Sequence, residues 1–231
     1  APGPLLPGSS YEFEISAVPG ARLSFASMFV PSNDLFFAPD EIGLPLFDEA
    51  GNPFAVNYTG DILLWDAGTE ASAEPGVGPN QVQRQPAANT GPADSDNSVR
   101  LVNDSFTYPQ VAGVIRVIVT PAPLQPISVR IENVSMNTTL MPSDGSSQFV
   151  PLSPGLWAVH VEDGPLFTTN EAERDQGLEH IAEDGDPGIL AGNLATQKSA
   201  LLSGIFNTPV GANAPGAIGP GGPDLPDSTG P

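Results

Sequence analysis

The chain has 231 residues, and its 27 acidic and seven basic side chains give a formal net charge of −20 at pH 7. This charge argues against nucleic-acid binding, because phosphate recognition needs clustered lysine and arginine. The sequence has no cysteine, which excludes a disulfide scaffold and thiol chemistry, and it has no apolar run of transmembrane length. Because 39% of the residues are hydrophobic, the chain can still form a core, and we expect a folded domain.

Turn residues and apolar runs predict a mostly β fold. The chain holds 25 glycines and 27 prolines, which favour many turns and short strands over long helices. A first hairpin is predicted from strands over residues 11–18 and 22–30, joined by the Pro19-Gly20 turn. Further strands are expected over residues 61–65, 98–103, 113–120, 126–134 and 156–161. Short strands with turn-rich links are typical of an antiparallel β-sandwich.

Helices are expected only in the last third of the chain. The first is predicted over residues 171–182, after an N-cap at Thr169 or Asn170, and the second over residues 189–202. The stretch 67–97 has almost no apolar periodicity, which in a loop of about thirty residues indicates a functional or mobile segment. The chain is therefore divided into an extended N-terminal segment (1–10), one sandwich domain (11–208) and a Pro/Gly-rich C-terminal tail (209–231).

Three acidic residues belong to two apolar runs that are each predicted to form a buried strand. Asp34 lies in the run over residues 23–37, Asp66 ends the second run, and Glu70 follows four residues later. Carboxylates at strand ends lie at the rim of a sheet, and two such rims could bring all three together. Like charges at one rim repel unless a cation neutralises them, and oxygen ligands suit Ca²⁺. The alternative is that Asp34 and Asp66 only cap turns, as aspartate often does.

The same residues carry a resemblance to a known family. The segments Ser32-Asn33-Asp34-Leu35-Phe36 and Trp65-Asp66-Ala67-Gly68-Thr69-Glu70 resemble the paired signature of the spondin N-terminal domain, and the similarity extends over residues 9–209 in its bacterial branch. The resemblance implies a C2-like β-sandwich with a bound calcium ion. It also implies that Asp34, Asp66 and Glu70 are the metal ligands. Leu35 stands where the family usually has tryptophan, and Glu70 stands where animal members have aspartate.

Catalytic motifs are weak in this sequence, and we expect no enzyme. The chain has two histidines and no Gly-x-Ser-x-Gly nucleophile elbow. His160 alternates with Val159 and Val161 in a predicted strand, so a surface or pocket-edge position is expected. The acidic stretch 94–97 lacks the glycine and terminal glutamate of an EF-hand loop and is expected to be solvated.

The leading functional hypothesis is a non-catalytic, secreted module that binds calcium and contacts other extracellular proteins or glycans in adhesion or in a matrix. The spondin resemblance implies this class. A chain that starts at Ala1 and not at methionine is expected to be a mature, exported protein. A calcium-dependent lectin, with the 67–97 loop and a calcium rim gripping sugar hydroxyls, is a further alternative.

A second hypothesis is a self-assembling structural subunit of a filament or surface layer. Residues 214–221 repeat the Pro/Gly pattern of residues 1–8 at five of eight positions, either by chance or as copies of one linker. If the terminal segment of one subunit docks on the next, the head-to-tail contact can build a homo-oligomer or a filament.

Overall fold

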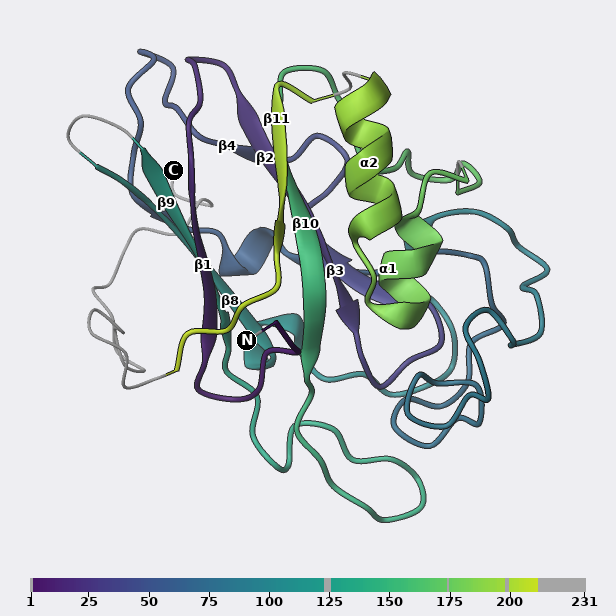
Figure 1. Ribbon diagram of the computed structural model, residues 1–231. Coiled ribbons are helices and arrows are strands. Elements are labelled where there is room, and N and C mark those ends of the chain that lie inside the picture. Colours follow the sequence, from purple (N-terminus) through teal and green to yellow (C-terminus); the bar gives the residue numbers. More distant parts are fainter. Residues whose placement is uncertain (1, 123–125, 174, 198–199, 212–231) are drawn as a thin grey trace.

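The computed structural model describes residues 2–122, 126–173, 175–197 and 200–211, and Figure 1 shows the order of its elements. The strands are β1 (Ser10–Ile15), β2 (Arg22–Phe29), β3 (Leu35–Ala38), β4 (Leu44–Pro45), β5 (Val56–Asn57), β6 (Leu63–Asp66), β7 (Arg100–Leu101), β8 (Ile115–Pro121), β9 (Ile127–Asn133), β10 (Leu152–His160) and β11 (Leu202–Phe206). The helices are α1 (Leu178–Asp184) and α2 (Gly188–Gln197), and two short 3-10 turns are η1 (Thr59–Asp61) and η2 (Val111–Gly113).

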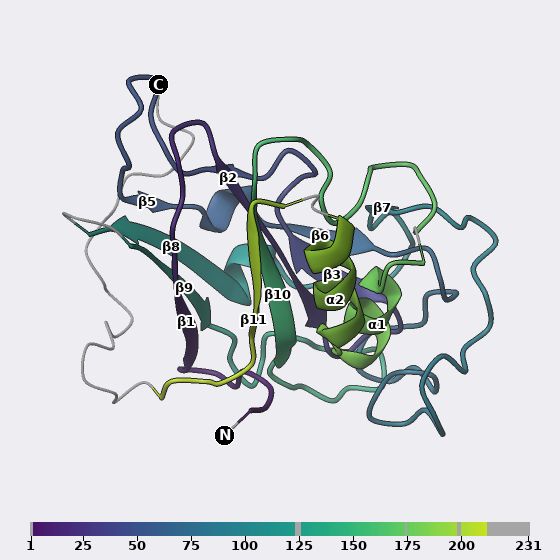
Figure 2. The same cartoon turned by 45° about the horizontal axis from the view of Figure 1, so that its top comes forward.

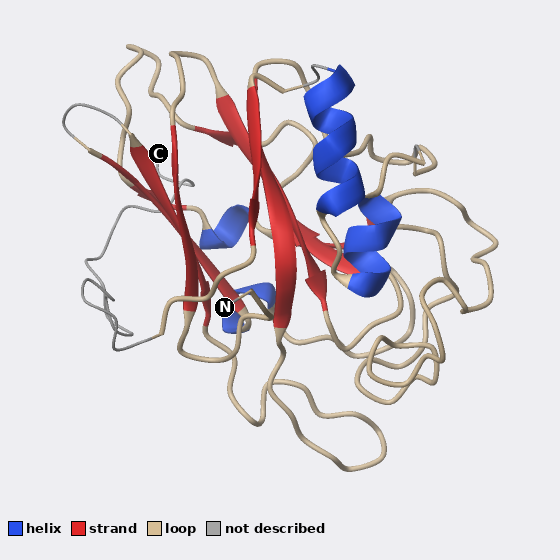
Figure 3. Cartoon of the chain, in the orientation of Figure 1, coloured by secondary structure: helices blue, strands red, loops and turns tan. Residues whose placement is uncertain are grey.

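The strands form two antiparallel sheets, which confirms the predicted mostly β class (Figure 3). The smaller sheet has the order β1-β9-β8-β5, and the larger sheet has the order β11-β10-β2-β3-β6-β7, with β4 paired to β2. Buried aromatic and aliphatic side chains from both sheets form one core. The arrangement is a β-sandwich, and the burial of this apolar core is its main stabilising term.

Helices α1 and α2 add a third layer over the larger sheet (Figures 1 and 2). A second core lies beneath them, and its sheet residues include Ala26, Phe36, Trp65 and Leu156. Strand β2 is therefore covered on both faces, and seven of its eight residues are buried. This double burial explains why its sequence is a continuous apolar run rather than an alternating one.

The predicted hairpin between the first two strands is wrong. Strand β1 pairs with β9 in the smaller sheet, whereas β2 pairs with β10 and β3 in the larger one. The Pro19-Gly20 turn therefore carries the chain from one sheet to the other. The burial patterns give the physical reason, because β1 has one half-exposed face while β2 is buried throughout and belongs in a sheet covered on both sides.

Other boundaries also differ from the prediction. Helix α1 starts at Leu178 and not near residue 171, since Asn170 takes a left-handed conformation with φ of 63° and Gly177 one with φ of 108°. The second predicted helix ends at Gln197, and Leu202 begins strand β11 instead. The apolar run over residues 23–37 divides into β2 and β3. The repeat predicted at residues 214–221, and the tail beyond Gly211, lie outside the described residues.

Segments from both ends of the chain meet at the seam between the two sheets. The Gly3 N–H donates to the Asn207 carbonyl at 2.8 Å, and Ser10 forms an antiparallel bridge with Val210. Phe206 in β11 stacks on Phe13 in β1, with ring centroids 5.6 Å apart, and Phe13 stacks on Trp157 in β10 at the same separation. This aromatic stack closes the side of the sandwich where β1 and β11 are adjacent (Figure 1).

We predict that Phe206→Ala lowers the free energy of unfolding by about 3–5 kcal/mol, because it removes a buried ring that both sheets contact. Urea denaturation measures this loss. The neighbouring Ile205 has 41% of its surface exposed, so Ile205→Ala should cost less than about 1 kcal/mol. Equal losses in the two variants would show that the stack does not hold the seam.

Candidate functional site

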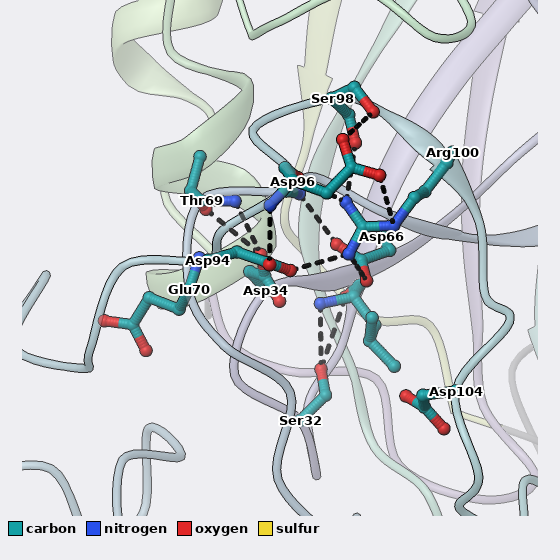
Figure 4. Close-up of polar contacts among 12 residues, drawn as sticks. Ser32, Asp34, Asp66, Thr69, Glu70, Asp94, Asp96, Ser98, Arg100 and Asp104 are labelled. Carbon is teal, nitrogen blue, oxygen red and sulfur yellow. Dashed lines mark hydrogen bonds and ion pairs between the residues drawn. The ribbon is translucent and has the colours of Figure 1, made fainter.

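Strands β3 and β6 bring Asp34 and Asp66 to one rim of the larger sheet. In their antiparallel register Leu35 lies opposite Asp66, and Asp34 immediately precedes Leu35. The Ala67 N–H donates to the Asp34 carbonyl at 3.1 Å, which continues the pairing by one step. A turn stabilised by the Ser32 hydroxyl, which accepts from the Leu35 N–H at 3.1 Å, sets the start of β3 (Figure 4). Asp34 and Asp66 therefore lie next to each other at this rim, as the sequence predicts.

The Asp34 carboxylate is fully buried and is hydrogen-bonded on one oxygen only. Its Oδ2 accepts from the backbone N–H groups of Thr69 and Glu70, each at 2.9 Å, and lies 3.2 Å from the Thr69 hydroxyl (Figure 4). Its Oδ1 has no hydrogen-bond partner among the described residues. Burial, together with the negative charge of Asp66, raises the pKa of Asp34 to about 7. The ionised side chain therefore lacks a neutralising partner.

Asp66 has such a partner, because Arg100 in β7 reaches it. Arg100 Nη2 lies 2.9 Å from Asp66 Oδ2 and 2.6 Å from Asp94 Oδ2, and the Gly68 N–H donates to Asp66 Oδ1 at 2.7 Å. Burial raises the pKa of Asp66 to about 6, while the Gly68 hydrogen bond and the Arg100 charge oppose that rise. In the acidic stretch 94–97, Asp94 is mostly buried and holds Arg100, so it is not the solvated residue that was predicted.

Glu70 is buried, but its carboxylate is directed away from Asp34 and Asp66 (Figure 4). The Gly91 N–H donates to its Oε1 at 2.5 Å, and Asn33 Nδ2 donates to its Oε2 at 3.3 Å. A Cβ atom at Gly91 would overlap this carboxylate, so any other residue there would require the Glu70 side chain to move. The loop over residues 67–97 was predicted to be functional or mobile. The hydrogen bond from Gly91 shows that this loop folds back over the side chain of Glu70.

Glu183 in helix α1 is a fourth buried acid, which the sequence analysis missed. The Thr69 hydroxyl lies 2.7 Å from Glu183 Oε1, and Oε2 has no hydrogen-bond partner within the described ranges. Burial, assisted by the charge of Glu70, raises the pKa of Glu183 to about 8. The only feature of the sequence that pointed to Glu183 was the acidic stretch around it. The helix predicted there, over residues 171–182, ended one residue before Glu183.

The site fits a hard cation in its donor chemistry. At this rim, three buried side-chain oxygens have no hydrogen-bond partner among the described residues, and they are Asn33 Oδ1, Asp34 Oδ1 and Glu183 Oε2. A fourth such oxygen, Glu132 Oε2, lies in β9 and is in an ion pair with Arg116. Carboxylate and amide oxygens are the ligands that Ca²⁺ prefers. Within the same residues, no group of three or more His, Cys, Asp or Glu side chains is arranged to hold a metal ion. Calcium binding by Asp34, Asp66 and Glu70 therefore stays a prediction.

Comparison of the chain with models of protein families, with curated proteins and with solved structures found no match. The spondin resemblance and the functions it implies thus stay predictions. Neither helix in the described ranges has the length and apolar character needed to cross a membrane.

His160 is buried in β10, which corrects its expected surface or pocket-edge position. Its Nδ1 lies 2.6 Å from the Glu162 carbonyl oxygen and its Nε2 lies 2.9 Å from Ser24 Oγ. Because a carbonyl only accepts, Nδ1 carries the proton and Nε2 accepts from the Ser24 hydroxyl. Burial lowers the pKa of His160, so the ring is neutral in the folded protein at pH 7. This arrangement holds two strands together.

We predict that His160 makes the fold less stable in weak acid. The folded pKa is below that of an unfolded histidine, so below about pH 6.5 the unfolded chain binds a proton that the folded chain does not. The contribution of His160 to the free energy of unfolding should fall between pH 7 and pH 5, by up to ~1.4 kcal/mol per pH unit. The raised pKa values of Asp34, Asp66 and Glu183 act in the opposite direction, so the contribution of His160 is read from the difference between wild type and a variant without the histidine. Denaturant titrations of wild type and His160→Gln across this range isolate the contribution. The same pH slope in both proteins would contradict the prediction.

Proposed function

We propose that the protein is a non-catalytic, calcium-binding β-sandwich module of the extracellular space, used in adhesion or in contact with a matrix. The observation that carries the proposal is the buried Asp34 carboxylate, with one oxygen held by backbone N–H groups and the other without a hydrogen-bond partner among the described residues. An ion there would remove the electrostatic cost of the buried charge.

The surrounding acids strengthen this interpretation. None of the ion pairs among the described residues includes Asp34, Glu70 or Glu183. Each of these three acidic residues is nevertheless at most 2% exposed. An unpaired buried carboxylate costs several kcal/mol, so such groups either hold protons or contact a cation. Millimolar calcium, as in extracellular fluid, would supply that cation, since extracellular calcium modules bind with dissociation constants of about 10⁻⁴–10⁻³ M.

The adhesive role rests on the spondin resemblance and on surface charge. A strongly acidic surface repels anionic partners unless calcium bridges the two. Calcium bound near the rim of the sandwich would add to the hydrogen bonds that already hold the segment from Thr69 to Gly91 against Asp34, Glu70 and helix α1. A module of this kind binds partners with a calcium-ordered loop surface and performs no chemical step.

We predict that calcium stabilises the wild-type protein against heat. A ligand that binds only the folded state adds about 2.7 kcal/mol at 100 times its dissociation constant, which raises the unfolding midpoint by roughly 5–10 °C for a chain of this size. Asp34→Asn should lose most of this rise while keeping the backbone hydrogen bonds. Asp144→Asn removes an exposed charge and serves as the matched control. No rise in wild type, measured in sodium chloride of equal ionic strength, would rule out the proposal.

A second candidate function is self-assembly into a filament or surface layer. The observation that favours it is the position of β11, an edge strand that pairs with β10 and continues to the bridge at Val210 beside β1. Strand β11 and the residues up to Val210 pack between β10 and β1 of their own chain. The same segment could instead pack between β10 and β1 of a neighbouring copy, which would give a head-to-tail contact.

Light scattering and electron microscopy of the purified protein, with and without calcium, test this second candidate. Assembly predicts particles or filaments whose number grows with protein concentration. Monodisperse monomers at all concentrations, in calcium as well as in chelator, would exclude it and leave the calcium proposal intact.

A further inference from the structure

Arg100 divides the buried acids of the rim into two groups. Its guanidinium lies within 3 Å of carboxylate oxygens of Asp66 and Asp94, so this group has a built-in cation. A metal ion placed at Asp66 Oδ2 would stand beside the positive charge of Arg100, which it would have to displace. The arginine therefore fills the role that the sequence prediction gave to calcium at Asp66.

The second group is centred on the Thr69 hydroxyl, and no basic side chain of the described residues is in ion-pair contact with it. Thr69 Oγ1 lies 3.2 Å from Asp34 Oδ2 and 2.7 Å from Glu183 Oε1. A hydroxyl has one proton and can donate to only one of these oxygens. When both carboxylates are ionised, the other contact brings two lone pairs together. Two buried charges thus share one donor, which makes the ionised pair unfavourable unless a proton or a further cation neutralises it.

Asn33 extends this group by one oxygen. Its Nδ2 donates to Glu70 Oε2, which leaves the amide oxygen buried and unpartnered within the described ranges. Glu70 itself has both oxygens engaged, one by this amide and the other by the Gly91 N–H. The contacts of Glu70 therefore fix the orientation of Asn33, and each Glu70 oxygen already has a hydrogen-bond partner, whereas Asn33 Oδ1 has none within the described ranges.

We propose that the cation-binding group consists of Asn33, Asp34 and Glu183, and that Asp66 and Glu70 are not ligands. The free oxygens are Asn33 Oδ1, Asp34 Oδ1 and Glu183 Oε2, a set of hard donors with two negative charges that suits a divalent ion such as Ca²⁺. The set joins the turn before β3 to helix α1. This inference rests on the proposed calcium binding and replaces the ligand set that the sequence predicts.

Isothermal titration calorimetry with calcium chloride, on the full chain, tests the assignment. Wild type should bind calcium, and Glu183→Gln should bind at least ~10-fold more weakly, because it loses a charged ligand. Asp66→Asn should change the dissociation constant by less than about threefold, because Arg100 already neutralises that side chain. Glu179→Gln, on the same helix, is the matched control and should bind as wild type does.

The outcomes separate the two proposals. No calcium binding by wild type would overturn both the proposed function and the ligand set. Binding by wild type that persists in Glu183→Gln, or that is lost in Asp66→Asn, would overturn the ligand set alone. Thermal unfolding in chelator checks that each variant folds, and Glu183→Gln should then be at least as stable as wild type, since an amide needs no counter-charge.

Discussion

The buried carboxylate of Asp34 is the constraint on which this rim of the molecule depends. It immediately precedes β3, and its Oδ2 accepts hydrogen bonds from two backbone N–H groups of the segment after β6. Those hydrogen bonds fix Thr69 and Glu70, whose side chains in turn contact helix α1 and the Asn33 amide. One ionisable group therefore links the sheet to the helical layer and to the long loop. A charge in that position is tolerated only if something neutralises it.

Two solutions to the same electrostatic problem lie side by side in this structure. At Asp66 the chain supplies its own cation, since Arg100 pairs with Asp66 and Asp94 and is itself mostly shielded from water. At Asp34 and Glu183 no such side chain is present in the described ranges, and the pKa values of both carboxyls are raised by burial. The first solution is permanent, whereas the second depends on a proton or an ion from solution. That difference makes the Asp34 group the part of the rim able to respond to its surroundings.

Much of the fold could be predicted from the sequence, because apolar alternation and turn residues are local signals. The sandwich class follows from short strands with turn-rich links, and the approach of Asp34 to Asp66 follows from strands that end in carboxylates. The hairpin around Pro19-Gly20 was wrong, since the choice of partner depends on which sheet can bury both faces of β2. Glu183 was missed because its contact with Thr69 joins residues 114 positions apart, and no local pattern encodes how a helix docks.

The most direct measurement is a crystal structure of the wild-type protein grown with calcium, with the ion located by its anomalous scattering. The result expected is one peak bonded to Asp34 Oδ1 and to Glu183, with metal–oxygen distances of about 2.3–2.6 Å and with Arg100 still paired to Asp66. A peak bonded to Asp66 and Glu70 with Arg100 displaced, or no peak at calcium concentrations that saturate extracellular modules, would contradict the assignment of the cation to the Asp34 and Glu183 group.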